Sequence, residues 1–206
     1  YVALIRQNGM NLLQIINDIL DISKIEAGKL EIEVAEYELN SFLEGIDSML
    51  SFMAQGKGLE FKIIQHDVLP DVIHTDQNRL RQCLVNLINN AIKFTDKGHV
   101  YMKVSLEKNT ENGHFLRFDV EDAGIGIPIE KQKMIFESFS QADGSTSRQY
   151  GGTGLGLTIT KQLTELLGGT LSLVSEKGKG AVFTLRIPTE QNSNLHVEYA
   201  ETLKTN

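Results

Sequence analysis

Residues 86–94 read NLINNAIKF, an apolar stretch that carries three asparagines and a lysine within nine residues. Its leucine and isoleucines favour a helix packed on a core, although asparagine is a mediocre helix former because its amide competes for nearby backbone groups. At about 100° per residue, Asn86, Asn90 and Lys93 share one side of this helix, with Asn89 at its edge. The opposite side is apolar and is expected to face the core: Leu80, Leu84, Leu87, Ile88 and Ala91.

The amide side has two interpretations that the helix alone supports equally. A solvated face is the simpler one, but such faces usually carry Glu, Lys and Arg rather than amides. The alternative is a nucleotide site, because an amide oxygen is a neutral hard ligand suited to Mg²⁺ that is already surrounded by phosphates. Lys93 would then reach a phosphate as a point charge.

The pattern around this helix predicts an α+β fold, a two-layer α/β sandwich with helices on one face of a mixed sheet. Asp76 is a good N-cap for the helix. Alternation and turn signals predict strands at 30–34, 59–65, 72–75, 99–107, 114–122, 170–175 and 180–188. Further helices are expected at 39–55, 154–167 and, as a short one after Pro128, 129–137.

One long amphipathic helix, from residue 2 to about residue 27, precedes this sandwich. Its apolar residues recur at threes and fours: Val2, Ile5, Leu12, Ile16, Ile19, Leu20 and Ile25. The next thirty residues offer this stripe no partner, which favours half of a helical hairpin or a dimer interface.

Composition narrows the classes of protein. The 206 residues are 41% hydrophobic and 23% charged, as in globular domains, and contain neither a membrane-spanning run nor a signal peptide. A net charge of −7 disfavours nucleic acid as a partner, and the single cysteine, Cys83, fits a reducing cytoplasm. Because the chain starts at Tyr1 rather than methionine, we expect it to be part of a longer protein.

Two glycine clusters are further candidates for chemistry. In DAGIGI, residues 122–127, Gly124 and Gly126 allow a tight turn and the approach of a flat ligand, and Asp122 could accept a hydrogen bond from an exocyclic amine or simply be a turn aspartate. In YGGTGLGLT, residues 150–158, backbone N–H groups at a helix start form an anion site, although hinge glycines of a lid would look the same.

The order of these clusters resembles the histidine protein kinases of two-component signalling. NLINNAIKFT resembles the N box of that family, DAGIGI and GGTGLGL its two glycine boxes, IFESF its F box, and GKGAVF a third glycine-rich element. Residues 12–33 resemble the second helix of the dimerisation and histidine-phosphotransfer hairpin, and residues 139–159 are typical of hybrid sensor kinases. The likeness covers residues 9–188.

The resemblance implies that ATP lies between helices, one sheet face and a mobile lid at residues 138–151. Asn90 would coordinate Mg²⁺, with Asn86 as a second polar contact to the nucleotide and metal. Lys93 would contact phosphate. The other implied ATP contacts form two groups. The adenine and ribose would be contacted by Phe94, Asp122, Gly124, Gly126, Ile127 and, through water, Thr184. The phosphates would be contacted by Arg148, Gly152, Thr153, Gly154, Leu155, Gly156 and Leu157.

The same resemblance implies three segments and several partners. Residues 1–29 would be an incomplete hairpin, 30–189 the catalytic domain and 190–206 a polar tail or linker. The implied partners are a phospho-accepting histidine helix of the same or another chain, a response-regulator receiver domain and, in the full-length protein, a second copy. A cytoplasmic location is expected, with any membrane anchor lying outside this chain.

One family feature is missing, because no histidine sits in a phospho-acceptor context; the five are His66, His74, His99, His114 and His196. We therefore expect the chain to bind ATP·Mg²⁺ without phosphorylating itself. Two alternatives remain: an ATP hydrolase of the gyrase, mismatch-repair and chaperone type, or a nucleotide-binding scaffold. The hydrolases carry a glutamate base where this chain has Asn86.

Overall fold

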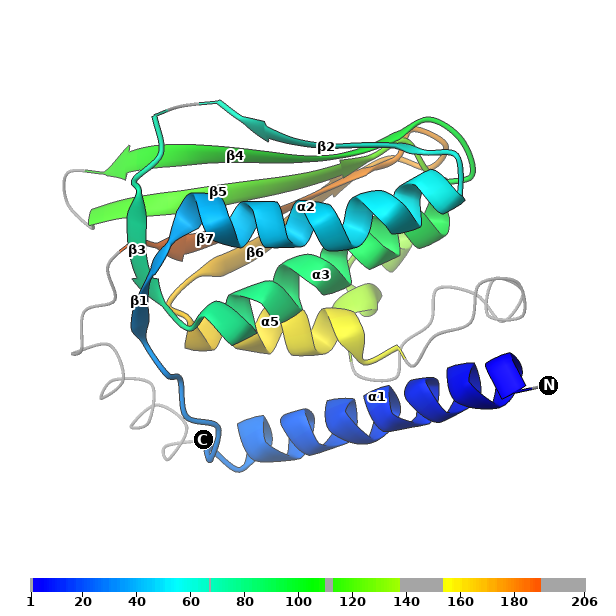
Figure 1. Cartoon of the computed structure of the whole chain (residues 1–206), viewed down its shortest axis with the longest axis horizontal. Helices are drawn as coiled ribbons and strands as arrows, with labels where there is room; N and C mark the ends of the chain where they lie inside the picture. The colour runs from blue at the N-terminus through cyan, green and yellow to red at the C-terminus, as the bar shows by residue number, and fades with distance from the viewer. Residues whose placement is uncertain (1, 67, 110–112, 138–153, 190–206) are drawn as a thin grey trace.

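A five-stranded mixed sheet with three helices on one face forms the body of the protein (Figure 1). The computed structural model describes residues 2–66, 68–109, 113–137 and 154–189. The strand order is β2 (Glu60–Gln65), β4 (His99–Asn109), β5 (Gly113–Asp122), β7 (Ala181–Pro188) and β6 (Thr170–Ser175). Only β2 and β4 pair in parallel, and the other neighbours are antiparallel. The predicted α+β sandwich is confirmed.

The helices α2 (Leu39–Gly56), α3 (Gln77–Phe94) and α5 (Gly156–Leu166) cover the sheet. The apolar side of α3 that the sequence predicts is at most 4% exposed at each of Leu80, Leu84, Leu87, Ile88 and Ala91. These residues join the inward-facing residues of β4, β5 and β7 in one hydrophobic core. The amide side of α3 is thereby directed away from the sheet.

Asp76 caps α3 as expected. Its Oδ1 accepts hydrogen bonds from the backbone N–H groups of Asn78 and Arg79, both at 3.0 Å, which satisfies two donors of the first turn. Its other oxygen accepts from the backbone N–H of Glu33 at 3.0 Å. The cap therefore also anchors the segment that connects the first helix to the sheet.

The strand predicted in that segment is wrong. Residues 30–34 alternate like a strand but form none, and the strand is instead β1 (Ala35–Glu38), paired antiparallel with β3 (Val72–Thr75) in a small separate sheet. Leu30 and Ile32 are apolar because they pack against the core, while the N–H of Glu33 is taken by Asp76. The predicted helix at 129–137 is also shorter, consisting of two 3₁₀ turns, η1 (Ile129–Lys131) and η2 (Met134–Phe136).

The long first helix, α1 (Val2–Glu26), is confirmed and lies alongside α5 (Figure 1). Near its C-terminal end Ile22 is buried, and Asp21 binds two side chains of α3: Arg79 at 3.3 Å and Gln82 at 2.8 Å. The opposite side remains exposed at Ile5, Leu12, Ile16 and Ile19. Within the described ranges, no helix combines the length and apolar character needed to cross a bilayer.

Candidate nucleotide-binding site

The amide side of α3 meets the N-terminal end of α5. The Nδ2 group of Asn86 donates a hydrogen bond of 2.7 Å to Oγ1 of Thr160. A methyl group on Gly156, the first residue of α5, would collide with Oδ1 of Asn86. The space that a side chain at position 156 would fill is therefore occupied by the Asn86 amide, which lies beside the start of α5.

Asn90, Lys93 and Phe94 continue this side of α3 toward its C-terminal end, and all three are half-buried. The ammonium group of Lys93 lies 4.8 Å from the centre of the Phe94 ring. Burial lowers the pKa of Lys93, because desolvation disfavours its charged form. An anionic ligand at this end of the helix would offset that desolvation.

Asp122 ends β5 close to the same point and is 8% exposed. Burial raises the pKa of its carboxyl group, while hydrogen bonds from the backbone of Gly124 and Ala181 act in the opposite direction. The Gly124 bond is 2.8 Å long. The carboxyl group is therefore an acceptor in a site largely shielded from water, as recognition of an amine by hydrogen bonding requires.

The loop after Asp122 reaches α3 directly. The N–H of Ile125 donates to the carbonyl of Phe94 at 3.3 Å, and a Cβ on Gly124 would collide with the same carbonyl. At Gly126, where φ is +64°, a Cβ would strike the carbonyl of Glu176. The prediction that these glycines leave room for a ligand is corrected: their free side is filled by the protein's own backbone.

Ile127 belongs to the same loop and is fixed by Ser175 of β6. Its N–H donates to the Ser175 hydroxyl at 2.8 Å, and that hydroxyl donates to the carbonyl of Gly180 at 2.7 Å. Gln132 adds bonds from its amide to the carbonyls of Ile127 and Ser175. The loop after Asp122 is thus tied to α3 on one side and to the β6–β7 turn on the other.

The start of α5 offers main-chain donors only. Leu155 is 1% exposed and Leu157 packs against the core, so neither side chain can contact a phosphate. The first intrahelical bond runs from Ile159 to the carbonyl of Leu155, and no acidic or capping side chain occupies the first turn. The predicted anion site would use the backbone N–H groups at this end of the helix, and Gly154 has φ +71° just before α5.

The IFESF motif also reaches α5. The hydroxyl of Thr158 donates to the carbonyl of Phe136 in η2 at 3.1 Å, and the Phe136 ring packs edge-on against Phe183 of β7. Arg148, Gly152, Thr153 and the predicted lid at 138–151 lie outside the described residues.

The structure does not bring Thr184 to this site. In the β5–β7 register Asp122 is opposite Ala181, and Thr184, three residues further, points to the other face of the sheet. Its hydroxyl donates to Asp119 there. The prediction of an adenine contact from Thr184 is therefore wrong, because three residues along a strand reverse the side-chain direction.

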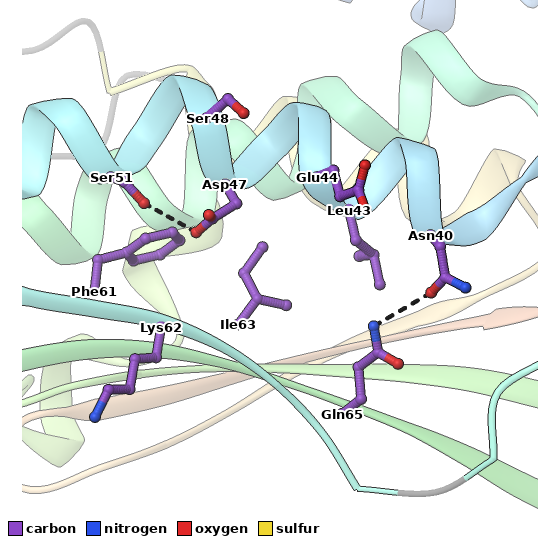
Figure 2. Close-up of a pocket in the computed structure, with 10 residues that line it drawn as sticks. All are labelled: Asn40, Leu43, Glu44, Asp47, Ser48, Ser51, Phe61, Lys62, Ile63 and Gln65. Atoms are coloured by element: carbon purple, nitrogen blue, oxygen red, sulfur yellow. Dashed lines mark hydrogen bonds between the residues drawn. The ribbon is translucent and has the colours of Figure 1, made fainter.

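A separate hollow of about 760 Å³ lies between α2 and β2 (Figure 2). Its lining includes Asn40 and Asp47 of α2 and Phe61 and Gln65 of β2, with a hydrogen bond between Gln65 and Asn40. None of the predicted site residues lines it, so it is distinct from the predicted nucleotide site.

Sequence reasoning missed two residues that shape the site, Thr160 and Ser175. Both are hydroxyl residues within regular elements and bond to partners far along the chain, Asn86 and Ile127. Nothing in their local sequence distinguishes them from other threonines and serines.

A mixed sheet with helices on one face, and an asparagine of α3 lying against the first residue of α5, is consistent with an ATP-binding domain of the α/β-sandwich class. The sequence pattern of the histidine kinase-, DNA gyrase B- and HSP90-like ATPases matches residues 75–191. The chain belongs to this family, and within it is a catalytic ATP-binding domain of the sensor histidine kinase type.

Relatives and a solved structure place the chain within that type. It is 42% identical over 188 residues to hybrid signal transduction histidine kinase B of Dictyostelium discoideum, covering 91% of this chain and 10% of that protein. It is 40% identical over 194 residues to the signal transduction histidine-protein kinase BarA of Escherichia coli K12, covering 94% and 21%. The full-length ShkA structure with AMPPNP superposes with a TM-score of 0.78 and 34% identity, covering 91% of this chain and 38% of ShkA. The chain thus spans a tenth to about a fifth of these curated relatives.

Proposed function

We propose that this domain binds ATP with Mg²⁺ and transfers the γ-phosphate to a histidine that lies outside this chain. The observation that supports it best is the position of Asn86, which bonds to Thr160 and lies against Gly156, the first residue of α5. A helix N-terminus attracts phosphate, and the amide oxygens beside it suit a hard cation that phosphates already surround. The structure of the relative ShkA in complex with AMPPNP supports this proposal.

Each group has a distinct proposed role. The carbonyl oxygen of Asn90 would hold Mg²⁺, with Asn86 as a second polar contact to the nucleotide and metal, and the cation would neutralise phosphate charge. Within the described residues, no three His, Cys, Asp or Glu side chains cluster to hold a metal, so amide and phosphate oxygens would be its main ligands. Lys93 would neutralise a phosphate, and Asp122 would accept a hydrogen bond from the adenine amine, which favours ATP over GTP.

Phosphate transfer to protein is favoured over hydrolysis by the residue at position 86. Hydrolysis in related ATPases uses a glutamate there to take a proton from water, and the Asn86 amide cannot take one. Its amide nitrogen is moreover committed to Thr160. We therefore infer slow intrinsic hydrolysis.

The partners and layout follow from the same proposal. The acceptor would be a histidine on a helix that forms a hairpin with α1, in the same or a partner chain of a homodimer. A receiver domain would take the phosphate next. Because ATP is supplied in the cytoplasm, the domain would lie on the cytoplasmic side of a membrane. Residues 1–29 would be the hairpin segment, 30–189 the catalytic domain and 190–206 a tail or linker.

The test is phosphate transfer to a separately produced, histidine-bearing hairpin of a two-component kinase. With γ-labelled ATP and Mg²⁺, we expect label on the hairpin and none on this chain. Asn90→Ala should abolish transfer, and Asn86→Glu should raise phosphate release to water. Acid-labile label on the isolated chain would contradict the absence of an internal acceptor. ATP binding without any transfer would instead favour a scaffold.

A further inference from the structure

Thr160 has a second hydrogen bond that its own helix does not require. This α5 residue is 1% exposed. Its hydroxyl donates to the carbonyl of Gly156, one turn earlier, at 2.9 Å, which is the usual bond of a helical threonine. The same oxygen accepts from Nδ2 of Asn86 on α3 at 2.7 Å. The second bond joins two helices through residues 74 positions apart.

The hydrogen-bonding chemistry of the Thr160 hydroxyl, the Gly156 carbonyl and the Asn86 amide determines which way that amide faces. A hydroxyl has one hydrogen, and a carbonyl can only accept, so the hydrogen of Thr160 is used on Gly156. Oγ1 can then only accept, so Asn86 must present its NH₂ group to it. The carbonyl oxygen of Asn86 is thereby turned the other way, against the Cα of Gly156 at the start of α5.

That oxygen is left with accepting capacity. Within the described ranges, no residue donates a hydrogen bond to Oδ1 of Asn86, and the side chain is only half-buried. An amide oxygen is repelled by phosphate oxygens and attracted by a cation or by the hydrogens of its bound water. The two faces of the amide are therefore not interchangeable at this site.

We infer that Thr160 is a positioning residue, which orients Asn86 so that its carbonyl oxygen, rather than its NH₂ group, faces the metal–triphosphate. The inference rests on the proposed function, since it specifies how Asn86 meets Mg²⁺. Thr160 is itself held in place, because its own carbonyl accepts from the Thr164 hydroxyl at 2.7 Å and from the Cys83 thiol at 3.8 Å.

The chain offers a matched set of variants. Thr160→Val removes the hydroxyl with little change of shape, and Thr160→Ser keeps it. Thr164→Val removes a neighbouring buried hydroxyl that makes the same kind of bond one turn later but does not touch Asn86. The set separates loss of the Asn86 contact from general loss of a buried hydroxyl on α5.

The first measurement needs no nucleotide. In NMR spectra of the free chain, the Asn86 side-chain NH₂ protons should exchange slowly with water in the wild type, Thr160→Ser and Thr164→Val. In Thr160→Val they should exchange at least several-fold faster. Equal exchange in all four proteins would overturn the positioning role, whether or not the chain binds ATP.

The second measurement is ATP affinity by calorimetry with Mg²⁺ and with EDTA. In Thr160→Val, the gain in affinity that Mg²⁺ provides should fall about tenfold, the effect of losing one buried hydrogen bond, while affinity in EDTA changes little. Thr160→Ser and Thr164→Val should keep the gain. An unchanged gain in Thr160→Val would overturn the metal-facing role of Asn86. A wild-type chain with no Mg²⁺-dependent affinity would instead refute the proposed function, and the metal-facing role with it.

Discussion

Asp122 takes its chemical character from its place in the fold. An aspartate before glycine is common in exposed turns, but this one is buried at the end of β5. Its burial raises the pKa of the carboxyl group above the usual 3.8. In the free folded protein Asp122 therefore binds a proton at a higher pH than in the unfolded chain, and the destabilising effect of its buried charge disappears as the pH falls through the raised pKa.

This pKa shift predicts a pH dependence of ATP binding. A hydrogen bond from the adenine amine favours the ionised carboxylate, so ATP affinity should fall as the pH is lowered through the raised pKa of the free protein. Asp122→Asn should bind ATP about fivefold more weakly at neutral pH, because a neutral acceptor is weaker than a charged one. The affinity ratio of wild type to variant should then shrink on acidification.

Calorimetric titrations of both proteins across the acidic range provide the measurement. ATP itself titrates in this range, but its contribution cancels in the ratio of the two affinities. A ratio that stays constant with pH would show that Asp122 does not contact the adenine amine in its ionised form.

At the scale of elements, α3 is held at both ends. Asp76 caps its first turn and also binds the N–H of Glu33. At the other end the ammonium group of Lys57 donates to the carbonyls of Ile92 and Lys93 at 2.8 and 2.7 Å, where a cation also complements the helix dipole. The helix that carries Asn86 and Asn90 is therefore fixed along its axis.

Removing the cap should destabilise the whole domain. Asp76→Ala should lower the free energy of unfolding by about 2 kcal/mol, because a buried cap is lost and three backbone N–H groups lose their acceptor. Urea unfolding measures this change. Asp47→Ala on α2 is the control. Asp47 is exposed, and among the described residues only Ser51 donates a hydrogen bond to its side chain, so its removal should change stability by about 0.5 kcal/mol or less. Equal effects would contradict the importance of the cap.

At the scale of the whole molecule, one side of α1 packs against the catalytic body and the other, called here the open side, is exposed to solvent. Ile22 and the bonds from Asp21 to Arg79 and Gln82 fasten one side to the catalytic body. Among the described side chains, α1 has six large apolar residues that are between 44% and 71% exposed: Ile5, Leu12, Leu13, Ile16, Ile19 and Leu20. A stripe of this size on one helix is a surface for another helix.

We expect weak self-association through this open side. Sedimentation should show a mass that rises with concentration, and the double substitution Leu12→Lys with Ile16→Lys should make the chain monomeric. Val174→Lys, which changes an apolar residue on β6 that is more exposed than either, should leave association unchanged. A tight dimer that survives the double substitution would place the interface elsewhere.

Whether a feature could be predicted from the sequence depends on how far apart along the chain the interacting residues are. The buried side of α3, its Asp76 cap and the alternating strands β4 and β5 were predictable, because periodicity and capping depend on residues within a few positions of one another. The pattern of helices and strands likewise predicted the α/β sandwich, and the family resemblance implied that Asn86 and the start of α5 both contact ATP. Where alternation had no partner strand to pair with, as at residues 30–34, the same local reasoning was wrong.

The sequence by itself determined the class of fold, the amide-bearing helix and the acidic residue at the end of β5. Only the tertiary structure decided that Thr184 points away from the site, that backbone fills the space beside Gly124 and Gly126, and that Thr160 orients Asn86. The physical reason is that strand register, close backbone approach and hydrogen bonds between helices join residues far apart in the chain. Their positions are set by how the elements pack, which no local pattern of residues records.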